Sequence, residues 1–366
     1  MRVYLDWNAT TPPLPAALEA TRLAAELHWA NPSSVHADGR AAAKTVEDAR
    51  AQVASLLDAD PRDVLFTSGG TEANNLAIRT ALARPGKLVV SPLEHPSSTK
   101  VSPPARVRRL AVRAEGVIDL DDLARALAEG PVAGVVLQTV NHETGVLQPV
   151  ADAIATVNVK APGTWIHVDV IQSVGKLSRE HQAFGATSRS VAAHKIRGPK
   201  GIGALVTLPR AKVLPVLLGG AQERGIRPGT VPAPLAAGFG AAARHAATSA
   251  AGFAATAPLR DALEAALVEL GARVNGAGPR APHVVNAYVP NWYGPELVAA
   301  LDLEGVSVAS GSACSAGTME PSPVIEAMFD RERAQRSVRF SLGETTTEAD
   351  VQAAIAALRR VVPRAG

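Results

Sequence analysis

A single cysteine is the residue of this chain that most directly suggests chemistry. Cys314 is the only cysteine in 366 residues, so it closes no intrachain disulfide and builds no multi-cysteine metal site. It lies in a run of small, weakly packing residues, 310–317 (SGSACSAG). Two interpretations are open: a buried, inert thiol, which is common for a free cysteine, or an exposed nucleophile whose reactivity depends on its thiolate form and on access. The flexible polar surroundings favour the nucleophile.

An amine and a carboxylate fall where predicted strands end. Asp169 closes a strand over 166–168, and Lys195 precedes the glycine-rich turn 198–201. The two residues form either an ordinary ion pair or part of a pyridoxal phosphate site. That cofactor needs a lysine for a Schiff base, a carboxylate to keep the pyridine nitrogen protonated, a flat partner for the ring and amide donors for the phosphate.

Further residues supply the remaining parts of such a site, and each also has a plainer interpretation. Gly70 and Thr71 open a helix directly after a strand, so free amides and the helix dipole suit a phosphate, although glycine turns before helices are common. His95 would stack on the ring, or it is a surface or core histidine. Gln172 would donate to the phenolic oxygen, or it is merely solvated. Arg339 would grip a substrate carboxylate, or it forms a structural salt bridge.

Strands and amphipathic helices alternate through the first two-thirds of the chain. The apolar spacing predicts helices over 40–58, 71–83 and 119–130, and strands over 64–67, 87–91, 132–140, 165–168 and 202–207. This alternation predicts an α/β fold with a mostly parallel sheet covered on both faces. Such sheets bind ligands beyond the carboxyl ends of their strands, which is where the candidate residues fall. Residues 187–190 are more polar than a buried central strand should be.

The pattern changes past about residue 245. Helices are predicted over 259–270, 296–301 and 347–361, and strands over 283–289 and 338–341. These elements indicate a smaller α+β unit onto which the first dozen residues fold back. Because the chain exceeds the usual size of one core, we expect a large domain over 14–245 and a small domain, made of 1–13 and 246–366, that carries the cysteine loop.

Composition excludes several classes of protein. The chain has 37 basic and 34 acidic residues, a formal charge of +3 and 47% hydrophobic residues, which is typical of a globular protein with no basic footprint for nucleic acid. No stretch approaches the roughly 20 apolar residues that span a bilayer, and the start lacks the apolar core of a signal peptide. We expect a soluble, cytoplasmic protein.

Taken together, ordered motifs along nearly the whole chain resemble the NifS/IscS-type cysteine desulfurases. The matching segments are 4–12 (YLDWNATTP), 31–36 (NPSSVH), 66–75 (FTSGGTEANN), 167–172 (HVDVIQ), 194–201 (HKIRGPKG), 223–230 (ERGIRPGT), 311–314 (GSAC) and 339–343 (RFSLG). These are pyridoxal-phosphate enzymes of the class V aminotransferase family. The resemblance implies fold type I, with a mostly parallel seven-stranded sheet in the large domain.

The resemblance also implies roles for particular residues. Lys195 forms the Schiff base and takes the α-proton, Asp169 pairs with the pyridine nitrogen, and His95 stacks on the ring and serves the substrate thiol. The other implied cofactor contacts are Gln172 and His142 near the phenolic oxygen, Gly70, Thr71 and His194 at the phosphate, and Thr230 reaching in from the second subunit of a homodimer. Asn31 and Arg339 orient the substrate carboxylate.

The implied reaction converts L-cysteine to L-alanine and leaves the sulfur on Cys314 as a persulfide. The sulfur then passes to acceptor proteins, such as an iron–sulfur scaffold or a sulfur carrier, for cluster assembly or for thiolation of tRNA or cofactors. A selenocysteine lyase or another class V aminotransferase-like enzyme is the alternative, although a transaminase needs no nucleophile at Cys314.

Three positions depart from the family pattern. Ala192 stands where a phosphate-binding serine is usual, His142 replaces an asparagine, and Ala221 interrupts a glycine triplet. Loss of one hydroxyl contact costs about 1 kcal/mol of cofactor binding. Ala192 and His142 motivate a third hypothesis, a catalytically impaired scaffold for sulfur carriers, whereas retention of Lys195, Asp169 and Cys314 opposes it.

Overall fold

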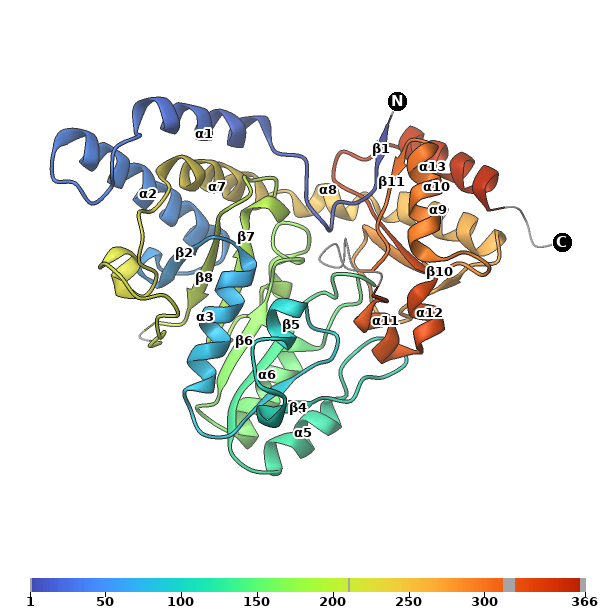
Figure 1. Ribbon diagram of the computed structural model, residues 1–366, viewed down its shortest axis with the longest axis horizontal. Helices are drawn as coiled ribbons and strands as arrows, with labels where there is room; N and C mark the ends of the chain where they lie inside the picture. Colours follow the sequence, from blue (N-terminus) through green and yellow to red (C-terminus); the bar gives the residue numbers. More distant parts are fainter. Residues whose placement is uncertain (1, 210, 312–319, 363–366) are drawn as a thin grey trace.

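The computed structural model describes residues 2–209, 211–311 and 320–362. Two units with separate hydrophobic cores make up this part of the chain (Figure 1). The main core of the larger unit holds residues between Ala17 and Ala246, and that of the smaller unit combines Val3 and Leu5 with residues between Leu263 and Val362. These cores support the proposed division into 14–245 and 1–13 with 246–366.

In the described part of the chain, a seven-stranded sheet forms the centre of the larger unit. Its strands are β2 (Val64–Thr67), β3 (Lys87–Val90), β4 (Val107–Arg109), β5 (Val132–Gln138), β6 (Trp165–Asp169), β7 (Ser188–Ala192) and β8 (Gly203–Thr207). The order is β2-β8-β7-β6-β5-β3-β4. Strand β8 runs antiparallel to both neighbours and every other pair is parallel, so the predicted mostly parallel α/β sheet is confirmed.

Helices cover both faces of this sheet. They are α1 (Pro15–Leu27), α2 (Ala37–Leu56), α3 (Gly70–Leu82), α4 (Pro96–Thr99), α5 (Leu120–Ala128), α6 (Val150–Lys160) and α7 (Ala233–Ala246). Helices α2, α5, α6 and α7 pack their apolar residues into one core with Val135 and Ile166 of the sheet. Helix α3 packs on the opposite face against Val136 and Trp165. Both faces of the strands are therefore buried, which explains their continuous apolar runs.

The smaller unit is built on an antiparallel sheet, and the N-terminus joins it. The strands are β1 (Val3–Tyr4), β9 (Arg273–Val274), β10 (Val284–Tyr288), β11 (Val306–Ser307) and β12 (Ser337–Ser341), and the helices are α8 (Ala250–Ala254), α9 (Ala257–Glu269), α10 (Gly294–Leu303), α11 (Pro323–Met328), α12 (Arg331–Gln335) and α13 (Glu348–Val361). Strand β1 pairs with β11, so the blue N-terminal strand lies among the red and orange elements (Figure 1). Residues 5–11 lead from there to the larger unit.

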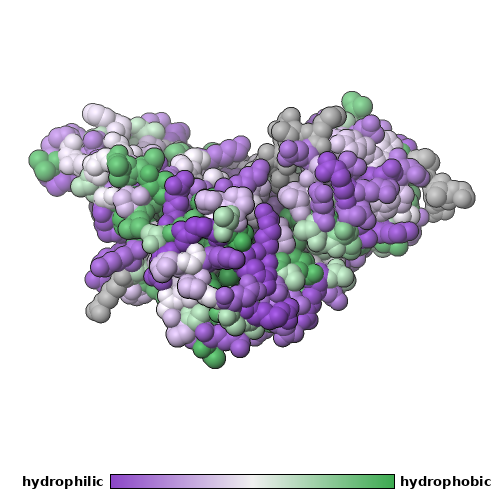
Figure 2. All heavy atoms as spheres, turned by 60° about the horizontal axis from the view of Figure 1, so that its bottom comes forward, coloured by the Kyte–Doolittle hydropathy of each residue, from purple (hydrophilic) through white to green (hydrophobic). Residues whose placement is uncertain are grey.

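The surface is unevenly apolar. On the face in Figure 2, apolar side chains gather at the end of the larger unit that carries α1 and α2, while much of the remainder is hydrophilic. Exposed large hydrophobic residues concentrate in two stretches: Leu18, Leu23, Leu27, Trp29 and Val35, and then Leu208, Leu214, Val216, Leu217 and Leu218. No helix among the described residues has the length and apolar run that a bilayer crossing requires.

Candidate active site

One cavity gathers most of the residues that the sequence analysis selected. It has a volume of about 190 Å³. Its lining includes Gly70, Thr71, His95, His142, Asp169, Gln172, His194, Lys195 and Arg339, together with Asn8, Ala9, Ser97, Gln138, Val140, Ile171 and Ala192. Asp169 ends β6 and Lys195 ends the short 3-10 turn η4 (Ala193–Lys195) that follows β7. The cavity therefore lies at the carboxyl edge of the parallel strands, as such sheets predict.

A chain of hydrogen bonds fixes Asp169. The Trp165 indole N–H donates to Ser188 Oγ (3.1 Å), and the same Oγ lies 2.9 Å from Nδ1 of His167. His167 then donates from Nε2 to Asn74 Oδ1 (2.9 Å), and Asn74 donates from Nδ2 to Asp169 Oδ2 (2.9 Å). Because an ionised Asp169 only accepts, Asn74 turns its Nδ2 toward Asp169 and its Oδ1 toward His167, whose one proton is therefore on Nε2 and whose Nδ1 accepts from the Ser188 hydroxyl. The carboxylate of Asp169 is thus held as an acceptor.

The protonation of this wall follows from burial and hydrogen bonding. The Ile171 backbone N–H donates to the second Asp169 oxygen, Oδ1, at 2.9 Å. Burial raises the pKa of Asp169, while the Asn74 and Ile171 hydrogen bonds and the charge of Lys195 act against that rise. Burial lowers the pKa of His167 to about 3, so this imidazole is neutral and carries one proton. A cation beside Asp169, such as a protonated ring nitrogen, would complete the pairing of the carboxylate.

The N-terminus of α3 opens onto the same cavity. No side chain caps this helix, whose N-cap is Gly69, so its first backbone N–H groups are open to an anion. A Cβ on Gly70 would stand 2.3 Å from Ile171 Cδ1, so any larger residue there would displace the Ile171 side chain. Thr71 and His194 add a hydroxyl and an imidazole to the lining, and Ala192 adds no polar atom.

The N-terminal segment reaches the amine of Lys195. Lys195 Nζ donates to the backbone oxygens of Asn8 (2.6 Å) and Ala9 (2.8 Å). Gln172 donates from Nε2 to the same Asn8 oxygen (3.0 Å) and accepts at Oε1 from Lys176 Nζ (2.6 Å). Burial lowers the pKa of the Lys176 ammonium well below its ordinary value. The orientation of the Gln172 amide is therefore fixed from both ends.

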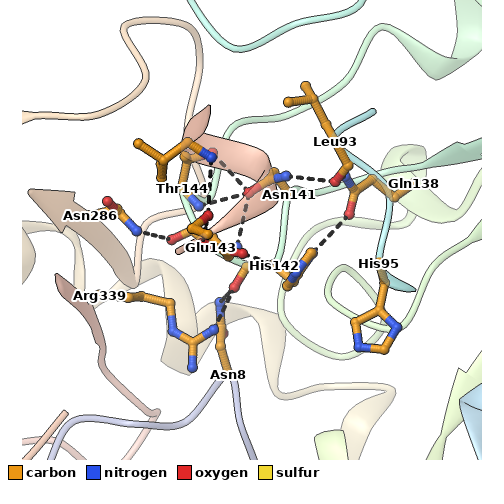
Figure 3. Close-up of polar contacts among 12 residues, drawn as sticks. Asn8, Leu93, His95, Gln138, Asn141, His142, Glu143, Thr144, Asn286 and Arg339 are labelled. Carbon is orange, nitrogen blue, oxygen red and sulfur yellow. Dashed lines mark hydrogen bonds and ion pairs between the residues drawn. The ribbon is translucent and has the colours of Figure 1, made fainter. Parts of the chain in front are cut away.

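His95 and His142 form a pair of imidazoles on the opposite wall, where Figure 3 shows them side by side. Their rings meet edge to face with centroids 5.2 Å apart. Nδ1 of His95 accepts from the Ser97 backbone N–H (3.1 Å). Burial, followed by the charge of Lys195, lowers the pKa of His95 to about 4. His95 is therefore neutral near pH 7, with its one proton on Nε2.

Arg339 forms a structural ion pair and also lines the cavity. Its Nη2 pairs with Asp6 Oδ1 at 2.6 Å, and its Nη1 donates to the backbone oxygen of His142 at 2.9 Å. Its Nε is buried without a hydrogen-bond partner among the described residues. The guanidinium is thus in a structural ion pair and also lines the cavity. A substrate carboxylate would take up the remaining donor capacity.

Two predicted site residues lie outside the cavity lining, and a third is not among the described residues. Asn31 lies in the exposed turn between α1 and α2, where its Oδ1 accepts from the Ser33 backbone N–H (2.9 Å). Thr230 is exposed, close before α7, and its predicted role belongs to a second subunit. Cys314 lies outside the described residues. The roles of all three remain predictions.

Some important residues escaped the sequence analysis. Asn74, His167 and Ser188 form the chain behind Asp169, and Lys176 orients Gln172. The available signal was polarity inside strands. His167 in β6 and Ser188 in β7 are polar residues at paired, fully buried positions, and this network accounts for Ser188 within the unexpectedly polar residues 187–190.

The donors and acceptors fit pyridoxal phosphate. Uncapped helix amides with Thr71 and His194 suit a phosphate dianion, a buried carboxylate suits a protonated ring nitrogen, and a lysine amine stands in the same cavity. Gly70 leaves the space that a Cβ would close. Ala192 removes one donor from this set without blocking it.

The chain is similar to known proteins along almost its whole length. The family described as aminotransferase class-V matches residues 3–354. A cysteine desulfurase of Frankia sp. (strain EuIK1) is 39% identical over 395 residues, which cover 99% of this chain and 91% of that protein. The NifS-like protein from Rickettsia africae ESF-5 superimposes with a TM-score of 0.90 at 29% identity, covering 99% of both chains. SspA in complex with cysteine gives a TM-score of 0.79 at 29% identity, covering 94% of this chain and 100% of that one.

Proposed function

We propose that Lys195 and Cys314 perform the two chemical steps of this enzyme. The chain belongs to the class-V aminotransferase family and is a cysteine desulfurase that uses pyridoxal phosphate. Lys195 binds the cofactor and moves the α-proton of L-cysteine. Cys314 receives the sulfur. The observation that supports this assignment best is the single cavity that joins Lys195, Asp169 and the open N-terminus of α3.

Bound pyridoxal phosphate supplies an aldehyde that condenses with amines and a ring that accepts electrons from the bonds of the substrate α-carbon. Asp169, held by Asn74 and Ile171, would pair with the ring nitrogen. Thr71, His194 and the α3 amides would hold the phosphate. The Lys195 amine lies in the cavity and would take the α-proton of the substrate.

The remaining residues place the substrate and its thiol. Arg339 would bind the carboxylate of L-cysteine through a charge-assisted hydrogen bond. His95, which is neutral because burial lowers its pKa to about 4, would be a hydrogen-bond partner of the substrate thiol. In the net reaction the thiolate of Cys314 takes the substrate sulfur as a persulfide, the substrate C–S bond breaks, and L-alanine leaves.

Mass spectrometry after incubation with L-cysteine tests this proposal. The peptide that contains Cys314 is expected to gain one sulfur, and alanine to appear in solution. Cys314→Ser removes the only thiol of the chain, so it should keep the cofactor absorbance and lose the persulfide. Lys195→Ala should lose the lysine-linked chromophore. Sulfide release at the normal rate by Cys314→Ser would refute the assigned nucleophile.

We also propose a homodimer that works in the cytoplasm and passes sulfur to acceptor proteins such as an iron–sulfur scaffold. The exposed apolar residues near α1 and over 208–218 support a second copy as the partner, because patches of this kind mark association surfaces. Thr230 would then reach the cavity of the other subunit. Light scattering of the purified enzyme is expected to give twice the mass of one 37.8 kDa chain, and a monomer at micromolar concentration would contradict this.

A further inference from the structure

The position of the proton on His142 follows from its neighbours. Gln138 donates from Nε2 to the Leu93 backbone oxygen (2.5 Å), so its Oε1 faces Nδ1 of His142 (3.4 Å). Figure 3 shows His142 between Gln138 and Glu143, with His95 nearby. Because an amide oxygen only accepts hydrogen bonds, Nδ1 of His142 carries a proton. A neutral His142 therefore has a bare Nε2.

Two acceptor atoms then face each other inside the protein. Nε2 of His142 lies 3.6 Å from Oε1 of Glu143. Both atoms are buried without a hydrogen-bond partner among the described residues. The other Glu143 oxygen, Oε2, accepts from Ser322 Oγ at 2.5 Å. Two unpaired acceptors in a dry site are costly. A proton on Glu143 Oε1 would replace their repulsion by an attractive contact, which becomes a hydrogen bond once the two atoms approach by a few tenths of an ångström.

We propose that Glu143 is held as a carboxylic acid that directs its proton toward Nε2 of His142, so that the two residues form a proton-holding pair in the wall of the cofactor cavity. His142 lines the cavity and is the binding residue, whereas Glu143 acts through it and is a positioning residue. The inference rests on the proposed function only for the identity of the cofactor. The placement of the proton itself depends on the geometry of this chain.

The local charges agree with a neutral pair. Burial raises the pKa of Glu143, and the Ser322 hydrogen bond and Arg339 only partly offset this. Burial, followed by His95, Arg339 and Lys195, lowers the pKa of His142 well below its ordinary value. The charged and titratable groups around the pair are thus Arg339 on β12, Lys195 on η4 and His95 just before α4. They place the proton on the carboxyl group while the imidazole stays available to receive it.

The pair is also rigidly placed, which keeps its two atoms in register. Asn141 Oδ1 accepts from the backbone N–H groups of Glu143 (2.9 Å) and Thr144 (2.8 Å). Asn286 donates to the Glu143 backbone oxygen (3.3 Å), and Arg339 donates to that of His142 (2.9 Å). A movement of the proton from Glu143 to His142 would change no net charge in the wall but would place the positive end beside the cofactor.

Infrared difference spectra of the wild type and Glu143→Gln test the proton directly, in the cofactor-free and loaded protein. A carboxylic acid band near neutral pH is expected in the wild type and missing in Glu143→Gln. Glu94→Gln is the matched control, because burial also raises the pKa of Glu94 and its band should be a different one. Ser322→Ala should move the Glu143 band without removing it. Identical wild-type and Glu143→Gln spectra in the acid region would overturn the proposal.

Titration of the cofactor absorbance tests the link to the cavity. Glu143→Gln and His142→Asn are each expected to shift the apparent pKa of the cofactor by at least about half a pH unit. The double variant should shift it no more than the larger single change, because each single substitution already breaks the same Glu143–His142 pair. Unchanged titration with retained cofactor binding would refute the link. A protein that forms no chromophore would instead contradict the proposed function, while the infrared result on the cofactor-free protein would still decide the placement of the proton.

Discussion

The two walls of the cavity differ in how fully their polar atoms are paired. Behind Asp169, the chain from Trp165 through Ser188, His167 and Asn74 satisfies every link. On the opposite wall, His142 Nε2, Glu143 Oε1 and Arg339 Nε are buried without partners among the described residues. The first wall, which we call the paired wall, already has its internal hydrogen bonds before any ligand binds. The second, the open wall, keeps capacity for a substrate and for mobile protons.

This difference matches the two tasks that the cavity must perform. A cofactor stays in place through many turnovers, so a ring partner that is already fixed in position serves it best. A substrate and its protons change at each turnover, and groups that stay paired in the resting enzyme would resist them. Unpaired buried atoms are destabilising, and proteins retain such strain chiefly where function uses it.

Asp169→Asn should give the largest effect, because it removes the charge from the paired wall. The variant is expected to bind Lys195-linked cofactor but to lose about a hundredfold or more in kcat/KM, the scale of one well-placed electrostatic group. It also sets the new amide against the Asn74 Nδ2 donor. Adding Asn74→Asp restores a matched hydrogen bond, so stability should recover while activity does not. Recovery of activity in the double variant would show that hydrogen bonding rather than charge is what matters.

Arg339→Lys tests the open wall next. The ammonium cannot keep Asp6 and the His142 oxygen while also offering the fork that a carboxylate prefers, so kcat/KM for L-cysteine should fall about 10- to 100-fold, mostly through KM. Asp6→Asn is the opposing control. It frees the guanidinium from its ion pair and should leave KM equal or lower. An unchanged KM in Arg339→Lys would mean that Arg339 is purely structural.

Asn74→Ala measures the structural cost of breaking the paired wall. The substitution removes the hydrogen bonds of the Asn74 side chain to His167, Asp169 and Ser97. It should lower the free energy of unfolding by about 2 kcal/mol. Asn75→Ala changes the same residue type on the same helix, where the side chain is half-buried and donates to its own helix at the Thr71 backbone oxygen. That control should stay within about 0.5 kcal/mol. Equal losses in a denaturant titration would contradict the pairing argument.

The contrast also marks what sequence alone can predict. Apolar periodicity located the strands and helices around β2, α3, β5 and β6, and strand ends located Asp169 and Lys195. The paired wall was hidden because Ser188 and His167 meet only across neighbouring strands, and a polar residue in a strand carries no label for its partner. Glu143 was hidden for a similar reason: its proton-holding role depends on a 3.6 Å approach to His142 that spacing does not show.

His167 gives the paired wall a pH signature. Its pKa is about 3 in the folded protein and near 6.5 when unfolded, so protons bind the unfolded chain more strongly. The stability that it contributes is complete above about pH 6.5 and is lost as pH falls toward 3, by up to about 1.4 kcal/mol per pH unit. The difference in unfolding free energy between wild type and His167→Gln should shrink accordingly. A difference that stays constant from pH 7 to pH 5 would mean that His167 is already protonated or exposed.

Ala192→Ser should have the smallest effect, and it asks whether the departure at the phosphate end matters. Ala192 is buried at the end of β7 and lines the cavity, with its Cβ 3.7 Å from where a Cβ of Gly70 would stand. A hydroxyl there adds one donor toward the expected phosphate and should tighten cofactor binding by about 1 kcal/mol, or about fivefold in Kd. Ala192→Val adds volume without a donor and should not tighten it. If both variants weaken binding alike, the cofactor already fills the space at Ala192. Alanine would then be needed there to leave room for the cofactor, and the missing hydroxyl would cost no binding.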